Sequence, residues 1–337
     1  MMHKKINFIF SGLTLLPLLQ SISFTKVSIA TSSAVIISRS ASVHASQRWG
    51  FWVDRGIKNF NEGNYEESIE NFTKAIKIKR IEPIPYNNRG EAKAALGDHL
   101  GAIEDYTKAI KYFSDFDDAY HNRGISKYNL NDYEGAITDY SKVIESDPNY
   151  VDAFYNRGLA KFDLEDYEGA IADYSKVIEL KVDYIDDAFY YRGVSKYYLG
   201  NIKGAIADYT KVIEINPNFA EAYIDRANSK YELKDYQGSI ADTSKAIEID
   251  PKNFDAYDIR GISKAALEDF YGSISDFDKA LEIAPTNLGI YKNRGISKEN
   301  VGDIKGACSD WKRASSLGDE DSKKWFKDDC KMFNKIN

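Results

Sequence analysis

The sequence has few residues that could build a catalytic or metal site. Its 337 residues include only four histidines and two cysteines, whereas a structural zinc site needs four such ligands close together. It contains no G-x-x-x-x-G-K phosphate loop, no H-E-x-x-H pair and no G-x-S-x-G turn. We therefore predict a protein that is not an enzyme, with no metal ion, no cofactor and no small-molecule substrate.

Positive charges are fewer than negative charges. The chain has 45 Lys and Arg residues against 52 Asp and Glu residues, a net charge of −7. A surface that binds nucleic acid requires clustered lysine and arginine, so the composition argues against a nucleic-acid partner. The acidic charge either serves solubility alone or favours basic partners.

Acidic residues are absent from the first 48 positions, where an apolar run follows two lysines and extends from Ile6 to Leu19. A basic region followed by a short apolar region is typical of a secretory signal. The run is short for a membrane span, and Pro17 interrupts it. We expect a signal peptide over residues 1–30, cleaved there or as late as 45, and a linker over residues 31–48.

A cleaved signal would export the protein to a periplasm, a thylakoid lumen or the cell exterior. An uncleaved leader is the alternative, and it would anchor the protein to a membrane; a disordered tail is the third possibility. Membrane contact is expected only through such an uncleaved leader.

One phrase returns along most of the chain, for example "YNRGLAKFDLEDYEGAIADYSKVIEL". Its glycine recurs at steps of 34 residues, once 35, with one alanine in its place: Gly56, Gly90, Gly124, Gly158, Gly193, Ala227, Gly261 and Gly295. A fixed period of this length predicts an array of helix–turn–helix repeats. We number the repeats one to eight by these positions.

Each repeat has the same pattern around its glycine. An aromatic residue lies four positions before it, and a small residue lies twelve after it. Sixteen after it is a large ring, with Thr243 as the exception in repeat six: Phe72, Tyr106, Tyr140, Tyr174, Tyr209, Phe277 and Trp311. Glycine opposite a small residue lets two antiparallel helices approach closely, with rings filling the space beside them. A proline then ends the second helix in four repeats.

These residues, in this order and at this period, resemble the tetratricopeptide repeat (TPR) family. The wording "NRG…K…GAI.DY" looks like the variant common in cyanobacterial members. The resemblance implies an all-α fold, a right-handed α-solenoid of about eight tandem repeats over residues 49–319, with a capping helix and tail in 320–337. It implies a non-catalytic scaffold that binds a protein or peptide in its concave groove. An assembly factor or chaperone for a protein complex, membrane-associated or lumenal, is the alternative.

In this family the first helices line the groove. The positions three before, four after and five after the glycine resemble groove positions, and in repeats three to six they hold these aromatic residues: Tyr128, Tyr155, Phe162, Tyr190, Tyr197, Tyr198 and Tyr231. Such rings suit peptide binding, but ordinary packing between first helices would explain them equally well. Acids recur six positions before the glycine, for example Asp118 and Asp152. They would rim a groove for a basic peptide, or complement the positive end of each helix.

The lysine and asparagine that co-chaperone members use to hold a C-terminal carboxylate do not occur together. Lys292 is combined with Ile296, and Asn228 with Ile224. We therefore do not predict binding of chaperone tails.

An arginine precedes the glycine, or its replacement, in all eight repeats, where the family more often has an apolar residue. In repeats two to eight a lysine follows four residues later and an aspartate sixteen residues later, as in Arg89, Lys93 and Asp105. A half-buried cation needs a carboxylate partner. We expect an internal ionic ladder in which each aspartate bridges the lysine of its own repeat or the arginine of the next. The alternative is a basic stripe that binds an anion.

The two cysteines lie in the last repeat and the expected capping helix. Cys308 replaces the isoleucine of the "GAI" motif, and Cys330 shares a helix face with Trp325, Phe326 and Phe333. In an exported protein Cys308 and Cys330 could form a disulfide; two buried free thiols are the alternative.

Overall fold

The computed structural model describes residues 40–180 and 185–330. These residues form seventeen α-helices, and no strand occurs among them. They divide into an N-terminal unit that ends at Ala188 and a C-terminal unit that begins at Phe189. The expected signal peptide and Phe333 lie outside the described residues.

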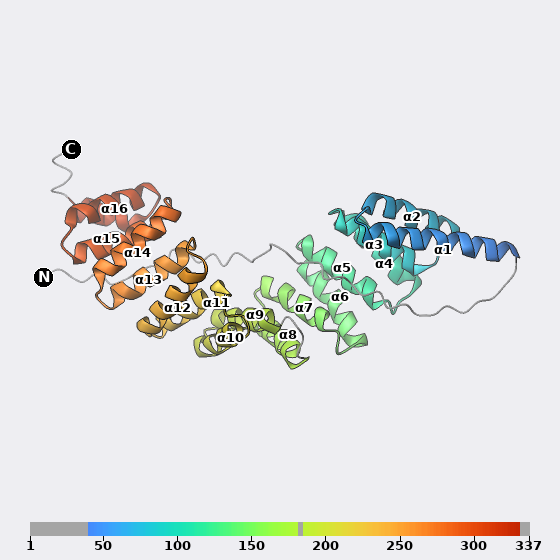
Figure 1. Ribbon diagram of the computed structural model, residues 1–337, viewed down its shortest axis with the longest axis horizontal. Coiled ribbons are helices and arrows are strands. Elements are labelled where there is room, and N and C mark those ends of the chain that lie inside the picture. The colour runs from blue at the N-terminus through green and yellow to red at the C-terminus, as the bar shows by residue number, and fades with distance from the viewer. Residues whose placement is uncertain (1–39, 181–184, 331–337) are drawn as a thin grey trace. The chain divides into compact units, whose positions relative to one another are not determined.

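The helices alternate between the first and second helix of each repeat (Figure 1). The N-terminal unit contains α1 (Ser40–Asn61), α2 (Tyr65–Ile78), α3 (Pro83–Ala95), α4 (His99–Tyr112), α5 (Asp117–Asn129), α6 (Tyr133–Ser146), α7 (Val151–Asp163) and α8 (Tyr167–Leu180). The start of α9 (Ile185–Tyr198) belongs to this unit and its remainder to the next.

The C-terminal unit continues the alternation and adds one helix. It contains α10 (Ile202–Ile215), α11 (Ala220–Glu232), α12 (Tyr236–Ile249), α13 (Phe254–Ala266), α14 (Phe270–Ile283), α15 (Leu288–Asn300), α16 (Ile304–Ser316) and α17 (Glu320–Asp329). The predicted all-α repeat architecture is thus confirmed, with two helices for each repeat of the sequence.

The repeat glycine sets the distance between the two helices of a repeat. The ring that lies sixteen residues later packs directly on it: a Cβ atom on Gly124 would lie 2.6 Å from Cε1 of Tyr140. Any side chain there would force the ring or the helix away. In repeat six the ring is replaced by Thr243, and Ala227 replaces the glycine, both fully buried. The two exceptions in the sequence therefore belong to one contact.

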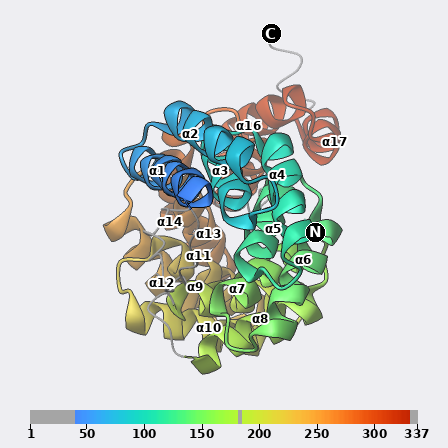
Figure 2. The ribbon, with the colours of Figure 1, turned by 90° about the vertical axis from the view of Figure 1, so that its right-hand side faces the viewer.

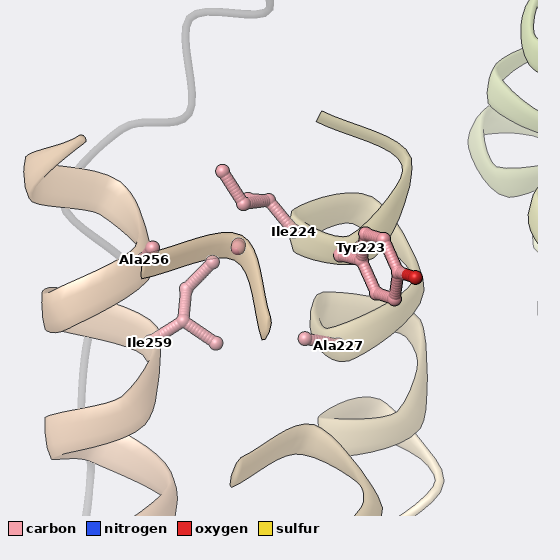
Figure 3. Packing of buried hydrophobic residues seen from close by; sticks show 6 residues of the cluster. Tyr223, Ile224, Ala227, Ala256 and Ile259 are labelled. Atoms are coloured by element: carbon pink, nitrogen blue, oxygen red, sulfur yellow. The ribbon is translucent and has the colours of Figure 1, made fainter. Parts of the chain in front are cut away.

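Successive repeats pack mainly through the second helix of one repeat and the first helix of the next, as α4 packs on α5 and α12 on α13, and successive first helices also contact each other. Helix α3 contacts α5 and α5 contacts α7 in the N-terminal unit, and α11 contacts α13 in the C-terminal unit. Figure 3 shows Ile224 of α11 and Ile259 of α13 extending toward each other, beside Tyr223, Ala227 and Ala256. The odd-numbered helices thus form one layer and the even-numbered helices the other. Figure 2 shows α3, α5 and α7 on the inner side of α4, α6 and α8.

The second helices begin at a recurring cap. In α6 the side chain of Asp132 accepts a hydrogen bond of 3.0 Å from the backbone N–H of Gly135. Such a bond satisfies one of the free N–H groups at the start of a helix. The same arrangement begins six other second helices, through Asp98, Asp166, Asn201, Asp235, Asp269 and Asp303.

The first helix differs from the sequence prediction at its start. Helix α1 begins at Ser40, inside the segment 31–48 that we expected to be a linker. Residues 40–48 contain two alanines and neither glycine nor proline, so nothing in their composition stops a helix from extending toward the N-terminus.

The C-terminal helix caps the last repeat, as predicted. Cys308 of α16 and Cys330, which follows α17, form a disulfide with a Cα–Cα distance of 5.8 Å. The Trp325 ring lies edge-on to Trp311, with centroids 5.5 Å apart. Helix α17 therefore covers the apolar end of repeat eight.

Candidate functional site

The arginine, lysine and aspartate of each repeat form a buried ionic cluster between its two helices. Arg89 donates two hydrogen bonds to Asp105, of 2.8 and 2.7 Å, and Nζ of Lys93 lies 2.7 Å from the same carboxylate. The cluster recurs in repeats three to eight, around Asp139, Asp173, Asp208, Asp242, Asp276 and Asp310. The predicted ladder is confirmed, and the aspartate takes both cations at once.

One detail of the ladder prediction is wrong. Each aspartate pairs with the arginine of its own repeat, because the two residues face each other across the helix pair. The arginine still joins neighbouring repeats through its other nitrogen: Arg123 donates to the hydroxyl of Thr107, at 3.1 Å. Similar bonds to the preceding repeat are made by Arg89, Arg157, Arg226, Arg260 and Arg294.

The electrostatics of the cluster favour the ionised aspartate. Burial alone would raise the pKa of Asp105, but the hydrogen bonds and positive charges of Arg89 and Lys93 outweigh it and hold this pKa below its usual value. Because the guanidinium groups are already bound to carboxylates, the clusters serve the architecture rather than the binding of an anion.

The candidate site is the side of the odd-numbered helices that faces away from the even-numbered helices, which we call the inner face. Three of the predicted groove residues pack on a ring at the start of their own second helix. Tyr128 contacts Tyr133 at 5.3 Å, Phe162 contacts Tyr167 at 5.4 Å and Tyr231 contacts Tyr236 at 5.2 Å between ring centroids. All three are half-buried. They can therefore support the turn of the repeat and still expose part of a ring.

The other four predicted residues differ in exposure. Tyr155 is half-buried and lies edge-on to Tyr174 at 6.0 Å, and Tyr197 is half-buried beside Tyr198, which is 44% exposed. Tyr190 is only 7% exposed. Its ring lies 5.0 Å from Phe219, and its hydroxyl donates to Asp225 at 2.8 Å. Tyr190 therefore contributes mainly to packing and offers little surface to a partner.

Polar side chains connect neighbouring first helices on this face of the N-terminal unit. Nδ2 of Asn122 donates to Glu91 at 2.8 Å, and Nδ2 of Asn87 donates to the same carboxylate at 2.9 Å. Asn156 contacts the His121 ring at 3.0 Å. The repeat pattern alone does not predict this network, although the asparagine two positions before the glycine recurs in "NRG".

A related network lies in the C-terminal unit. The Tyr197 hydroxyl donates to Glu232, and Nδ2 of Asn228 lies 3.2 Å from the Tyr197 oxygen. Asp225 lies on the same helix, three residues before Asn228, and is buried. Most of these contacts join residues 31 or 35 positions apart, that is, equivalent turns of successive first helices.

Burial shifts the pKa of several groups on this face. It raises the pKa of Glu91 to about 7, despite the hydrogen bonds from Asn87 and Asn122. It also raises the pKa of Asp225 to about 7 and that of Asp255 to about 6, and it lowers the pKa of His121 to about 4. A positive charge placed near these acids would favour their ionised forms.

The acids six positions before the glycine lie in the first turn of their helices, as in Asp118 of α5, Asp152 of α7, Glu221 of α11 and Asp255 of α13. This position complements the positive end of each helix.

The lysine at the clamp position is occupied within the protein. Lys292 is buried, and its Nζ lies 2.6 Å from Asp321 and 3.4 Å from Asp319, on and beside α17. Its Nζ also lies 5.2 Å from the Trp325 ring centroid. Lys292 thus holds the capping helix.

Among the described residues, no group of three or more histidine, cysteine or acidic side chains is placed to hold a metal ion. None of their helices is both long and apolar enough to cross a membrane.

Comparison with known families gives matches along both units. A "TPR repeat" model matches residues 126–165. One "tetratricopeptide repeat" model matches residues 151–184 and 186–219, and another matches 59–81, 85–116 and 220–253. No curated protein matches the sequence.

Among solved structures, the chain is similar to a C-terminal part of a TPR repeat-containing protein from Cytophaga hutchinsonii. The TM-score is 0.62 at 20% identity, over 72% of this chain and 98% of that one. A tetratricopeptide repeat protein from Parabacteroides merdae gives 0.53 at 21% identity, over 74% and 99%. YrrB, described as a TPR protein with an unusual peptide-binding site, gives 0.50 at 24% identity, over 56% and 96%. At these identities the likeness shows the fold.

Proposed function

Because the chain belongs to the tetratricopeptide repeat family, we propose that it is a non-catalytic scaffold that binds a partner protein or peptide on its inner face. The observation that carries this proposal is the row of partly exposed rings on the first helices, interspersed with acids of raised pKa, the half-buried Glu91 and the buried Asp225. Rings give a peptide large contact area at low entropic cost. The peptide-binding site of YrrB is a precedent within this fold.

We further propose that the partner is basic. Lysine or arginine side chains would pair with the acids of the inner face, such as Asp152 in one unit and Asp255 in the other. Binding such a cation would draw a proton from Asp255, whose pKa is about 6. Affinity for a basic peptide should therefore rise as the pH increases from 5 to 8.

A panel of synthetic peptides with matched length and opposite charge tests both points. Calorimetry should detect binding of the basic peptides to the intact protein. Replacing Tyr197 and Tyr198, both in the C-terminal unit, by alanine should weaken binding by about tenfold or more, since buried aromatic anchors each contribute more than about 1 kcal/mol. Tyr190 is left intact because its removal would disturb the core.

The control variant is Tyr271→Ala, which removes a ring that is exposed on the second helix α14 and should leave binding unchanged. Equal loss in both variants, or no preference for basic peptides, would contradict the proposal. A partner captured by every variant would place the binding surface elsewhere on the protein.

We also propose that the protein is exported. The disulfide between Cys308 and Cys330 supports this, because disulfides persist in oxidising compartments and are rare in the cytosol. Intact-mass measurement of the protein from its native source should show loss of the residues before a new N-terminus near 31 or 46. A full-length chain in the soluble cytosolic fraction would argue against export.

A membrane-associated or lumenal assembly factor or chaperone for a protein complex is the second candidate function. The exposed apolar residues Ile81 and Phe113 of the N-terminal unit favour it. The two functions differ in fractionation: an assembly factor of this kind should remain on membranes after a salt wash, whereas a soluble scaffold should be released.

A further inference from the structure

Because the eight repeats share one pattern, residues at equivalent positions can be compared between them. Two repeats differ from the others at the edge formed by the loops between repeats. The helices are antiparallel, so the end of each second helix lies beside the start of the next first helix. In repeats three to seven the second helix carries, near its end, a lysine and a glutamate that pair with each other: Lys142–Glu145, Lys176–Glu179, Lys211–Glu214, Lys245–Glu248 and Lys279–Glu282. Charge is thus balanced along this edge.

Repeats one and two break this balance. At the position of the glutamate they carry Lys77 and Lys111, both exposed and both in the last turn of their helices. Neither lysine forms an ion pair with a carboxylate in the described part of the chain. Residues 74–84 hold four basic residues and one acid, Glu82, which lies 3.5 Å from Lys79. This loop is basic in an otherwise acidic protein, whereas the next loop, after Lys111 and Phe113, carries Asp115, Asp117 and Asp118.

Exposed apolar side chains lie at the same edge. Ile81, Ile84 and Phe113 are 72%, 46% and 50% exposed. Other repeats carry polar residues at the equivalent positions: Asn149 and Asn218 for Ile81, Asp118 and Asp152 for Ile84, and Asp147 and Asp250 for Phe113. The repeat pattern therefore does not require an apolar residue at any of the three.

Contacts beneath these residues show that they form one patch. The Tyr86 hydroxyl donates to the backbone carbonyl of Arg80 at 3.0 Å, and the Tyr86 ring lies 5.6 Å from that of Tyr112. The Phe113 ring lies 5.9 Å from Phe116, and Tyr86 and Phe116 belong to one core cluster. The ends of α2 and α4 and the start of α3 thus present Ile81, Ile84, Tyr112 and Phe113 together, flanked by Lys77, Arg80 and Lys111. We call this set the basic apolar edge.

We propose that the basic apolar edge binds the surface of an anionic membrane. Lysines beside exposed apolar and aromatic tips are suited to a bilayer interface, where the tips enter the acyl boundary and the cations meet anionic headgroups. Lysine is depleted in protein–protein interfaces, which makes an acidic protein the less suitable occupant. The inference goes beyond the proposed partner binding, which uses the inner face.

Binding of the full-length chain to vesicles tests the proposal. Co-sedimentation would use vesicles of zwitterionic phosphatidylcholine, with and without about one third phosphatidylglycerol. The readout is the ratio of the two partition coefficients, because every variant carries the same leader and its contribution is constant. The wild type should prefer the anionic vesicles, and added salt should reduce the preference.

Two variants replace residues of the basic apolar edge by residues that other repeats carry at the equivalent positions. The variants should therefore still fold. Lys77→Glu/Lys111→Glu should lower the ratio by about tenfold or more, since each basic residue near an anionic surface contributes about fivefold. Ile81→Asn/Ile84→Asp/Phe113→Asp should lower the partition coefficient for the anionic vesicles by a similar factor. Circular dichroism would verify that the helical content is unchanged.

Matched controls lie in the C-terminal unit. Lys203→Glu/Lys305→Glu makes the same change in net charge at exposed positions, and Ile215→Asn/Tyr271→Asn removes exposed apolar side chains. Both should bind vesicles like the wild type. Equal effects in control and edge variants, or no preference of the wild type for anionic lipid, would overturn the proposal. If the edge variants no longer bound an acidic partner protein but bound vesicles like the wild type, that result would also overturn the proposal.

Discussion

The helix contact of repeat six differs from that of the other repeats in two matched residues: alanine replaces the glycine, and threonine replaces the ring. Where the repeat has glycine, a ring packs on the bare backbone; Gly261, for instance, would place a Cβ atom 2.7 Å from the Phe277 ring. In repeat six Ala227 supplies that Cβ atom, and Thr243 leaves room for it. The contact is therefore a matched pair of residues rather than two independent preferences.

This matched pair predicts that substitutions at positions 227 and 243 have non-additive effects on the free energy of unfolding. Thr243→Tyr alone should destabilise the protein by about 1–3 kcal/mol, because the ring would collide with the methyl group of Ala227. The double variant Ala227→Gly/Thr243→Tyr restores the arrangement of the other repeats and should recover most of this loss. Urea denaturation of the two single variants and the double variant measures the coupling energy. Additive effects within about 0.3 kcal/mol would contradict the contact.

Buried Asp225 predicts a pH dependence of stability. Burial raises its pKa to about 7, so the folded state favours the neutral carboxyl. Stability from this group is fully present below its unfolded pKa of about 4 and is lost as the pH rises through about 7. Asp225→Asn keeps an acceptor for the Tyr190 hydroxyl and removes the ionisation. Relative to the wild type, the variant should gain about 2 kcal/mol of stability between pH 5 and pH 8.

Thermal denaturation of wild type and Asp225→Asn across this pH range measures the difference. Asp328→Asn is a suitable control, since this acid is exposed on α17 and its loss should not change the pH profile. Parallel profiles for the wild type and Asp225→Asn would show that Asp225 is ionised in the folded protein.

At the scale of the elements, the capping helix depends on few contacts and one covalent bond. Helix α17 is held by Lys292, by Trp325 and by the disulfide that closes a loop of 22 residues. Reduction should lower the unfolding free energy of this end by about 3 kcal/mol on the loop-entropy account. Hydrogen exchange should then increase first in α17 and α16.

Mass spectrometry under denaturing conditions checks the bond itself. The chain should gain two hydrogen atoms on reduction and should take up two alkyl groups only after it. Alkylation of both cysteines without a reductant would show two free thiols. Serine at both positions should reproduce the exchange pattern of the reduced protein.

At the scale of the whole molecule, a repeat array transmits disturbance only to its neighbours. Helix α5 contacts α3, α4, α6 and α7 among the described helices, and an array of this kind is close to one-dimensional in its energetics. Gly124→Ala should therefore increase hydrogen exchange in α5 and α6 most strongly and less in the adjacent repeats. Amides of α13 to α16 should keep their protection, as measured by mass spectrometry of peptides. A uniform loss along the chain would indicate global cooperativity instead.

The sequence by itself determined the repeat, because a period of 34 residues with glycine, small and ring positions leaves few other ways to bury the apolar faces. It also indicated that the aspartates lie near the lysines and arginines, since lysine and aspartate are both missing from repeat one and both present in the other seven repeats. The Cys308–Cys330 bond remained open at that level, because spacing alone does not place two sulfur atoms within bonding distance.

Tertiary structure decided which neighbour each side chain meets. Periodicity places a residue on a helix face, but it does not say whether the partner across that face belongs to the same repeat or the next. For this reason the pairing of Arg89 with Asp105, the burial of Tyr190 against Phe219 and the bond of Asn122 to Glu91 could be found only in three dimensions. The same reason explains the basic apolar edge, whose residues come from three helices and lie together only because antiparallel packing brings the ends of those helices to one side.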